Sequence, residues 1–292
     1  MLAHLLDLVV SAVLLAGLYA TMAYGLGLIY GVLRVVNLNH GGMIMAGAYG
    51  GFWLHARFGL DPYLALPLVM GAAFVVGAAT YLVLVRRLPR GAAGGVQSLL
   101  LLFGVWLILR NAAYLVFTGN DQTLRTSYST RSLPLLGAHL SVNRLAVFAV
   151  AAVTLLALHL LLRRSLLGKA IRAAAQNADS CARCGIPVER VYAFTFGLGS
   201  ALAALGGLLG ATLFSFNPSY GSAELLKSFV VVVLGGLGSV VGTAVAALVL
   251  ALCEVFAILA LPSYLTQVVG FALLVLVLVL RPGGLFGQKV LG

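Results

Sequence analysis

The sequence has few charged residues and very few acidic ones. Asp, Glu, Lys and Arg make up 9% of the 292 residues, and only seven are acidic, whereas a soluble domain carries about 25% charged residues. Hydrophobic residues make up 62% of the chain and the mean hydropathy is +1.10, which excludes a soluble globular domain, a disordered chain and a coiled coil. The apolar runs are continuous and do not alternate, which excludes a transmembrane barrel. We therefore predict an all-α, polytopic integral membrane helical bundle.

Cysteine is scarce as well. The three cysteines are Cys181, Cys184 and Cys253, and an odd number without a cysteine-rich stretch gives no disulfide framework. The pair Cys181 and Cys184 has CxxC spacing, but no second pair or nearby histidine completes a closed zinc site. We expect no metal site.

Motifs of common enzymes are missing from the sequence. It contains no GxxxxGK[ST] phosphate loop, no HExxH zinc motif and no GxSxG nucleophile elbow. Of the five histidines, only His40 lies in a polar motif. Because intramembrane catalysis needs a nucleophile with a base in reach, we expect no catalytic residues and no enzymatic activity.

Long apolar runs predict the membrane segments, since a helix needs about 20 apolar residues to cross the hydrocarbon core. The expected spans are 8–30, 41–55, 63–85, 96–117, 145–162, 191–214, 240–261 and 265–280. A shorter segment at 224–238 is interrupted by glycines. The prediction is one transmembrane domain over residues 1–292, with eight or nine membrane segments, some of them interrupted.

The net charge of +11 comes from basic residues that lie between apolar runs. This pattern is typical of cytoplasmic loops in membrane proteins and gives no reason to expect a nucleic-acid partner. It predicts that 86–95, 163–190 and the C-terminus lie in the cytoplasm and that 118–144 lies outside. With nine segments the N-terminus also lies outside.

A polar motif follows the first predicted span, at residues 30–42 (YGVLRVVNLNHGG). Asn37, Asn39 and His40 precede the pair Gly41 and Gly42, and polar groups at membrane depth are tolerated only where protein or a water-filled path satisfies them. We expect the glycine pair to break the helix beside these side chains. Such a break suits a polar or zwitterionic solute whose carboxylate faces a helix N-terminus. The alternative is a short cytoplasmic turn between two spans.

A second glycine-rich element lies late in the chain, at 235–242 (GGLGSVVG), after Glu224 and Lys227. Interrupted segments in corresponding places of two halves indicate a transport site. The alternative is that these glycines only allow close helix packing. Two further charges, Arg110 and Glu254, lie inside apolar runs, and each is expected to face the bundle interior or a partner.

The loop 163–190 contains a third element, a predicted alanine-rich helix over 168–182. Arg172, Gln176 and Asp179 recur there at helical spacing, and 185–187 (GIP) ends the helix. A short exposed helix of small residues fits a groove on a partner protein. The alternative is a linker helix on anionic membrane lipid.

Four stretches of the sequence together resemble one family, the permease subunit of a branched-chain (hydrophobic) amino acid ABC importer. They are 30–41, then 167–177 (LGKAIRAAAQN) with 185–191, then 226–242 (LKSFVVVVLGGLGSVVG), and the ending 280–287 (LRPGGLFG). They occur in the family's order, and the resemblance covers nearly the whole chain.

The resemblance implies a multi-pass subunit of the bacterial inner membrane that binds no cofactor itself. ATP and Mg would lie on two cytoplasmic ATPase subunits. A second, related permease and a periplasmic solute-binding protein would complete the importer. The loop helix would transmit ATPase closure to the spans. The implied coupling residues are Gly168, Arg172, Gln176, Asn177 and Gly185, and the implied translocation path includes Asn37, Asn39, His40 and Gly41.

Three residues depart from the family's usual pattern. Asn39 replaces a small residue, Gly42 stands where an acidic residue is common, and Arg110 where a neutral polar one is more usual. These departures leave urea, short amides or other small organic solutes open as the cargo. A self-sufficient secondary transporter or channel is the rival class, although such proteins usually carry acidic or histidine proton relays inside their spans, and this chain offers little beyond Glu254.

Overall fold

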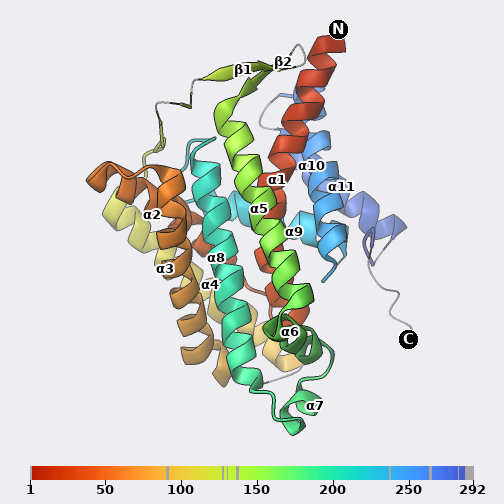
Figure 1. Ribbon diagram of the computed structural model, residues 1–292. Helices are drawn as coiled ribbons and strands as arrows, with labels where there is room; N and C mark the ends of the chain where they lie inside the picture. The colour runs from red at the N-terminus through yellow and green to blue at the C-terminus, as the bar shows by residue number, and fades with distance from the viewer. Residues whose placement is uncertain are drawn as a thin grey trace.

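The computed structural model describes residues 2–89, 92–126, 128–129, 131–135, 138–236, 238–262, 265–281 and 283–286. Its helices run up and down along one direction and form a bundle (Figure 1). The helices are α1 (Leu2–Leu33), α2 (His40–Phe58), α3 (Pro62–Val83), the short 3₁₀ helix η1 (Val85–Arg87), α4 (Ala92–Phe117), α5 (Val142–Arg164), α6 (Leu166–Gln176), α7 (Ala178–Arg183), α8 (Val188–Ala211), α9 (Tyr220–Gly235), α10 (Val240–Ala260) and α11 (Thr266–Leu280). Strands β1 (Ser132–Leu135) and β2 (Ala138–Ser141) form an antiparallel hairpin with Ser132 opposite Ser141.

Six helices of the described chain are long and apolar enough to cross a membrane, which confirms the predicted helical membrane bundle. They are Asp7–Leu33, Pro62–Arg87, Gly95–Phe117, Val142–Arg164, Val188–Ala211 and Val240–Leu259. A seventh apolar stretch, Val268–Leu280, is shorter. The predicted spans at 41–55 and 224–238 correspond to α2 and α9, which do not belong to these six.

The loops gather at two opposite ends of the bundle. The hairpin and the start of α1 lie at one end, and α6 and α7 lie at the other (Figure 1). At the hairpin end, the side chain of Asn143 donates to the Thr212 carbonyl at 2.6 Å. At the far end, Arg86 Nε lies 3.3 Å from Glu189 Oε2. The loops 118–144 and 163–190 are therefore at opposite ends, as the predicted topology requires, and which end faces the cytosol stays a prediction.

The helix α8 lies at the centre of the bundle and is buried along most of its length. It packs against α1, α2 and α3, and small residues make the approach close. A side chain at Gly47 would come within 2.0 Å of the Ala204 carbonyl oxygen. Such contacts are typical of membrane helices, where small residues let backbones meet.

The glycine-rich element at 235–242 forms the turn between α9 and α10. Gly236 and Gly238 have φ angles of 92° and 86°, a left-handed backbone that favours glycine. A side chain at Gly242 would lie 2.0 Å from the carbonyl oxygen of Gly235. The described part of this element thus combines a break between two helices with close packing at Gly235 and Gly242, and its part in a transport site stays a prediction. Leu237 of this element lies outside the described residues. So do Arg90 and Lys289, two of the basic residues in the regions predicted to be cytoplasmic.

Candidate translocation site and coupling loop

The polar turn 34–39 brings the chain back into the bundle interior after α1. The His40 ring nitrogen Nε2 lies 2.8 Å from the Met22 carbonyl oxygen. Met22 lies eleven residues before Leu33, where α1 ends, which corresponds to about 16 Å along a helix. The helix α2 therefore begins inside the bundle, beside the middle of α1.

Three polar side chains at the end of this turn and the start of α2 are buried and carry atoms without hydrogen-bond partners. Asn37, Asn39 and His40 are 0%, 1% and 0% exposed. Both amide atoms of each asparagine, and Nδ1 of the histidine, have no partner among the described residues. Most buried polar side-chain atoms in proteins are paired, so this region has hydrogen-bonding capacity that its own fold does not use. The structure thus brings together the three predicted path residues, and their contact with solute remains a prediction.

The expected helix break at Gly41 and Gly42 is wrong. The break falls at 34–39, and both glycines belong to the first turn of α2. Gly41 instead contacts α9, since a side chain there would lie 2.5 Å from the Gly221 carbonyl oxygen. The reciprocal contact is closer still, because a side chain at Gly221 would lie 2.0 Å from the Gly41 carbonyl oxygen. Close packing, and not chain reversal, explains why Gly41 has no side chain.

The start of α9, late in the chain, resembles the start of α2, because each helix follows a short non-helical stretch. The two helices meet at Gly41 and Gly221, one residue after each helix starts, so their electropositive N-termini lie near each other. The late part of the chain is thus interrupted at 212–219, before α9, as well as between α9 and α10 at the glycine-rich element that the sequence indicated. The stretch 216–221 (FNPSYG) carries the missed signal, because its Asn-Pro-Ser turn precedes the helix.

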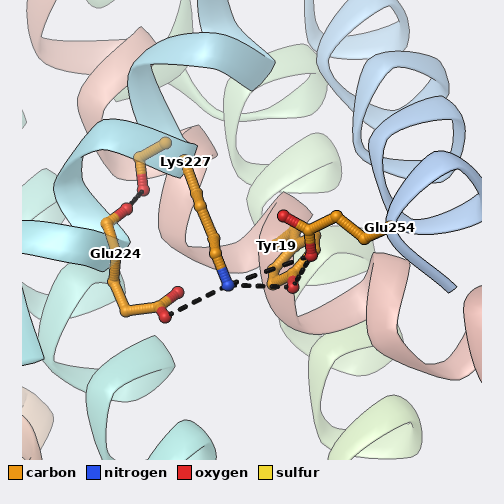
Figure 2. A network of polar contacts seen from close by, with 5 residues as sticks. Tyr19, Glu224, Lys227 and Glu254 are labelled. Carbon is orange, nitrogen blue, oxygen red and sulfur yellow. Dashed lines mark hydrogen bonds and ion pairs between the residues drawn. The ribbon is translucent and has the colours of Figure 1, made fainter. Parts of the chain in front are cut away.

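A cluster of charged side chains joins α1, α9 and α10 (Figure 2). Lys227 Nζ lies 3.5 Å from Glu224 Oε1 and 3.9 Å from Glu254 Oε2. It also donates to the Tyr19 hydroxyl at 3.1 Å, and that hydroxyl donates to Glu254. The sequence presented Glu254 as an isolated charge, and the structure gives it two partners.

The other intramembrane charge, Arg110, lies elsewhere. Its guanidinium is 5.2 Å from the centre of the Trp106 ring and 6.0 Å from that of Tyr114, both on α4. These are cation–π distances. Arg110 and Glu254 thus have separate partners in the structure.

The predicted helix 168–182 is two helices, so this expectation is wrong. Asn177 has an extended backbone, with φ −155° and ψ 101°, and ends α6. Its side-chain oxygen accepts from Ser180 N at 2.9 Å and caps α7. Alanine favours helix, but asparagine favours the N-cap position. Asp179 consequently lies on α7 and does not continue the face of Arg172 and Gln176.

The five predicted coupling residues divide by position. Gly168 is buried at the corner between α5 and α6, where a side chain would lie 2.2 Å from the Leu161 carbonyl oxygen. Gly185 has a φ angle of 80°, which ends the loop before α8. With the cap made by Asn177, these residues fix the shape of the loop. Arg172 and Gln176 are exposed on α6, where they are open to a partner.

Comparisons with known proteins agree with these features. The model of the family described as "Branched-chain amino acid transport system / permease component" matches residues 8–278. The high-affinity branched-chain amino acid transport permease BraD of Pseudomonas aeruginosa is 32% identical over 299 residues, covering 98% of this chain and 96% of the relative. LivH of Escherichia coli, with the same printed role, is 29% identical over 296 residues and equally well covered.

A more distant match is the probable branched-chain amino acid permease LivH of Methanocaldococcus jannaschii, 26% identical over 251 residues, or 84% of this chain and 78% of the relative. No solved structure matches the chain significantly. The family model covers nearly all of the bundle, from Leu8 in α1 to Leu278 in α11. The chain belongs to the permease component family of branched-chain amino acid transport systems.

Proposed function

We propose that this chain is the permease subunit of an ATP-driven importer for branched-chain or other hydrophobic amino acids in the bacterial inner membrane. The observation that carries the proposal is the group of buried, unpaired polar atoms on Asn37, Asn39 and His40. Similarity to permeases of this kind over almost the full length supports it.

The chemistry of the site suits an amino acid that passes through it. Asparagine amides offer both donors and acceptors, and the N-termini of α2 and α9 favour the solute's carboxylate. The bundle would alternate between outward and inward openings as α2 and α9 repack. Few strong contacts keep release fast, so selectivity rests chiefly on an external solute-binding protein.

The loop with α6 and α7 is the proposed docking site for the ATPase subunits. Two such subunits would carry ATP and Mg in the cytoplasm, and a second related permease would complete the membrane part. The exposed side chains of Arg172 and Gln176 would meet the ATPase surface. Gly168, Asn177 and Gly185 would hold the helices at the required angles.

The test is uptake by the assembled transporter in proteoliposomes. Complex formed with its ATPase, second permease and binding protein should accumulate labelled leucine, isoleucine or valine only when ATP is present on the ATPase side. Accumulation of urea or acetamide in place of these amino acids would contradict the solute class. Vesicles with this chain alone should take up nothing, and uptake without ATP would indicate a secondary transporter.

A further inference from the structure

The charged cluster of Figure 2 is not electrically balanced. It contains two carboxylates, on Glu224 and Glu254, and one ammonium, on Lys227. Glu254 is held by the Tyr19 hydroxyl as well as by Lys227. The second oxygen of Glu224, Oε2, is buried and has no hydrogen-bond partner within the described residues. With both carboxylates ionised, one negative charge of this cluster lacks a counter-charge.

The unpaired carboxylate lies close to the polar turn. Glu224 follows Gly221 by three residues, or nearly one turn, on α9. Gly221 contacts Gly41, which follows Asn39 and His40 in the sequence. Ten buried side-chain atoms of the described chain lack a hydrogen-bond partner, and seven belong to this region. The seven are Asn37 Oδ1 and Nδ2, Asn39 Oδ1 and Nδ2, His40 Nδ1, the Tyr220 hydroxyl and Glu224 Oε2.

An uncompensated carboxylate inside a membrane protein is costly and is commonly functional. The side chain of Glu224 is 9% exposed, so water compensates it little. Arg110 lies against aromatic rings of α4, and Lys227 is already shared between two carboxylates. The missing partner is a cation of small size with several hydrogen-bond donors.

We infer that Glu224 binds the α-ammonium group of the solute as it crosses the bundle. The inference rests on the proposed function and makes its solute class more specific. A free amino acid carries both charges that the site can receive, a carboxylate for the helix N-termini and Asn37 and Asn39, and an ammonium for Glu224. Urea and short amides carry no ammonium and leave Glu224 uncompensated.

The first test measures leucine moved per ATP hydrolysed by the complete transporter, with saturating leucine-loaded binding protein. Glu224→Gln should lower this ratio by about tenfold, because the amide offers no negative charge to the ammonium. Glu224→Asp should restore part of it. Asp121→Asn removes an exposed carboxylate at the hairpin end of the bundle and should leave the ratio unchanged.

A triple variant separates this role from a structural ion pair. Lys227 pairs with Glu254 as well as with Glu224, so Glu224→Gln is combined with Lys227→Met and Glu254→Gln, which removes every charge of the cluster. If Glu224 served only to balance charge, the triple variant would restore transport, whereas the ammonium role predicts no recovery, since the carboxylate is still missing. Recovery in the triple variant, or a wild-type ratio in Glu224→Gln, would overturn the inference while leaving leucine import by the wild type intact.

A measurement on the wild-type complex guards against variants that fail to assemble. Isoamylamine has the ammonium without the carboxylate, and isocaproate has the carboxylate without the ammonium. When each compound is added at millimolar concentration on the binding-protein side of the membrane, isoamylamine should slow leucine transfer more than isocaproate does. The Glu224→Asp variant should keep this order. Equal inhibition by the two, or stronger inhibition by isocaproate, would contradict an ammonium site. A wild-type complex that moves no leucine would instead refute the proposed function.

Discussion

Two asparagines are the N-cap residues of two helices of this protein, and their side chains differ in exposure and in hydrogen bonding. Asn177 begins α7 at an exposed end of the bundle, and its side-chain oxygen accepts from Ser180 N at 2.9 Å. Asn39 begins α2 in the interior, is 1% exposed, and makes no capping bond. A cap bond is worth about 1 kcal/mol to a helix. Asn39 does not make this cap bond, so its amide is free to bind another polar group.

The regions around these two asparagines differ in the same way, one exposed with its polar groups paired and the other buried with polar groups unpaired. At the loop end, Ser165 caps α6 and Asn177 caps α7, so backbone donors are satisfied and charged side chains point outward. In the interior, unpaired polar atoms are concentrated where α2 meets α9. Leaving a buried polar group unpaired costs about 1–3 kcal/mol. A region that tolerates this is expected to bind a small polar molecule, whereas a satisfied, exposed one is expected to bind a protein surface.

The largest expected effect comes from the contact that holds the interior region together. Gly221→Val would place a side chain on the Gly41 carbonyl oxygen, and backbone cannot move aside as a flexible side chain can. Overpacking of this kind costs about 3 kcal/mol or more. We expect the yield of assembled, detergent-stable protein, measured by size-exclusion chromatography, to fall more than about tenfold.

The matched control is Gly104→Val on α4, where an added side chain meets nothing within 4 Å. It should assemble like the wild type. Normal assembly of Gly221→Val would show that α2 and α9 do not meet as described. The interior region of unpaired polar atoms would then not be formed by these two helices.

The second effect concerns the unpaired amide of Asn37. Asn37→Leu keeps the branched arrangement of four side-chain heavy atoms but removes both unpaired polar atoms, so we expect leucine uptake to fall about tenfold while thermal stability holds or rises, because the unpaired polar group is gone. Uptake by proteoliposomes and thermal unfolding of the same preparation measure the two. Asn111→Leu changes an exposed asparagine of α4 and should alter neither, and normal uptake by Asn37→Leu would make the turn purely structural.

Much of the bundle could be predicted from the sequence, because long apolar runs decide membrane helices locally. Asn37 and His40 stood out for the same reason, as polar residues against an apolar background. The meeting of Gly41 with Gly221, and of Tyr19 with Glu254, joins residues far apart along the chain, and periodicity carries no information on such pairs. The division of α6 from α7 was missed because alanine propensity outweighed the single cap signal of Asn177.

The third effect tests the exposed region. Arg172→Glu reverses a charge on the exposed face of α6, and we expect it to weaken binding of the ATPase subunits about fivefold in a pull-down titration, since like charges across an interface repel. Arg131→Glu makes the same change at the hairpin end of the bundle and should leave ATPase binding unchanged. Equal weakening by both variants would indicate a general effect of charge, and no weakening by Arg172→Glu would remove α6 as the docking element.

The smallest effect compares the two asparagines directly. Asn177→Ala removes the α7 cap bond at a cost of about 1 kcal/mol, so hydrogen exchange at Ser180 should quicken about fivefold and uptake should fall less than threefold. Asn177→Asp keeps an oxygen at the same place and should keep slow exchange. Asn39→Ala should do the reverse, lowering uptake without quickening exchange at the start of α2, because no cap bond exists there to lose. Faster exchange in both alanine variants would mean that Asn39 supports its helix as Asn177 does, and its amide would then no longer be free for solute.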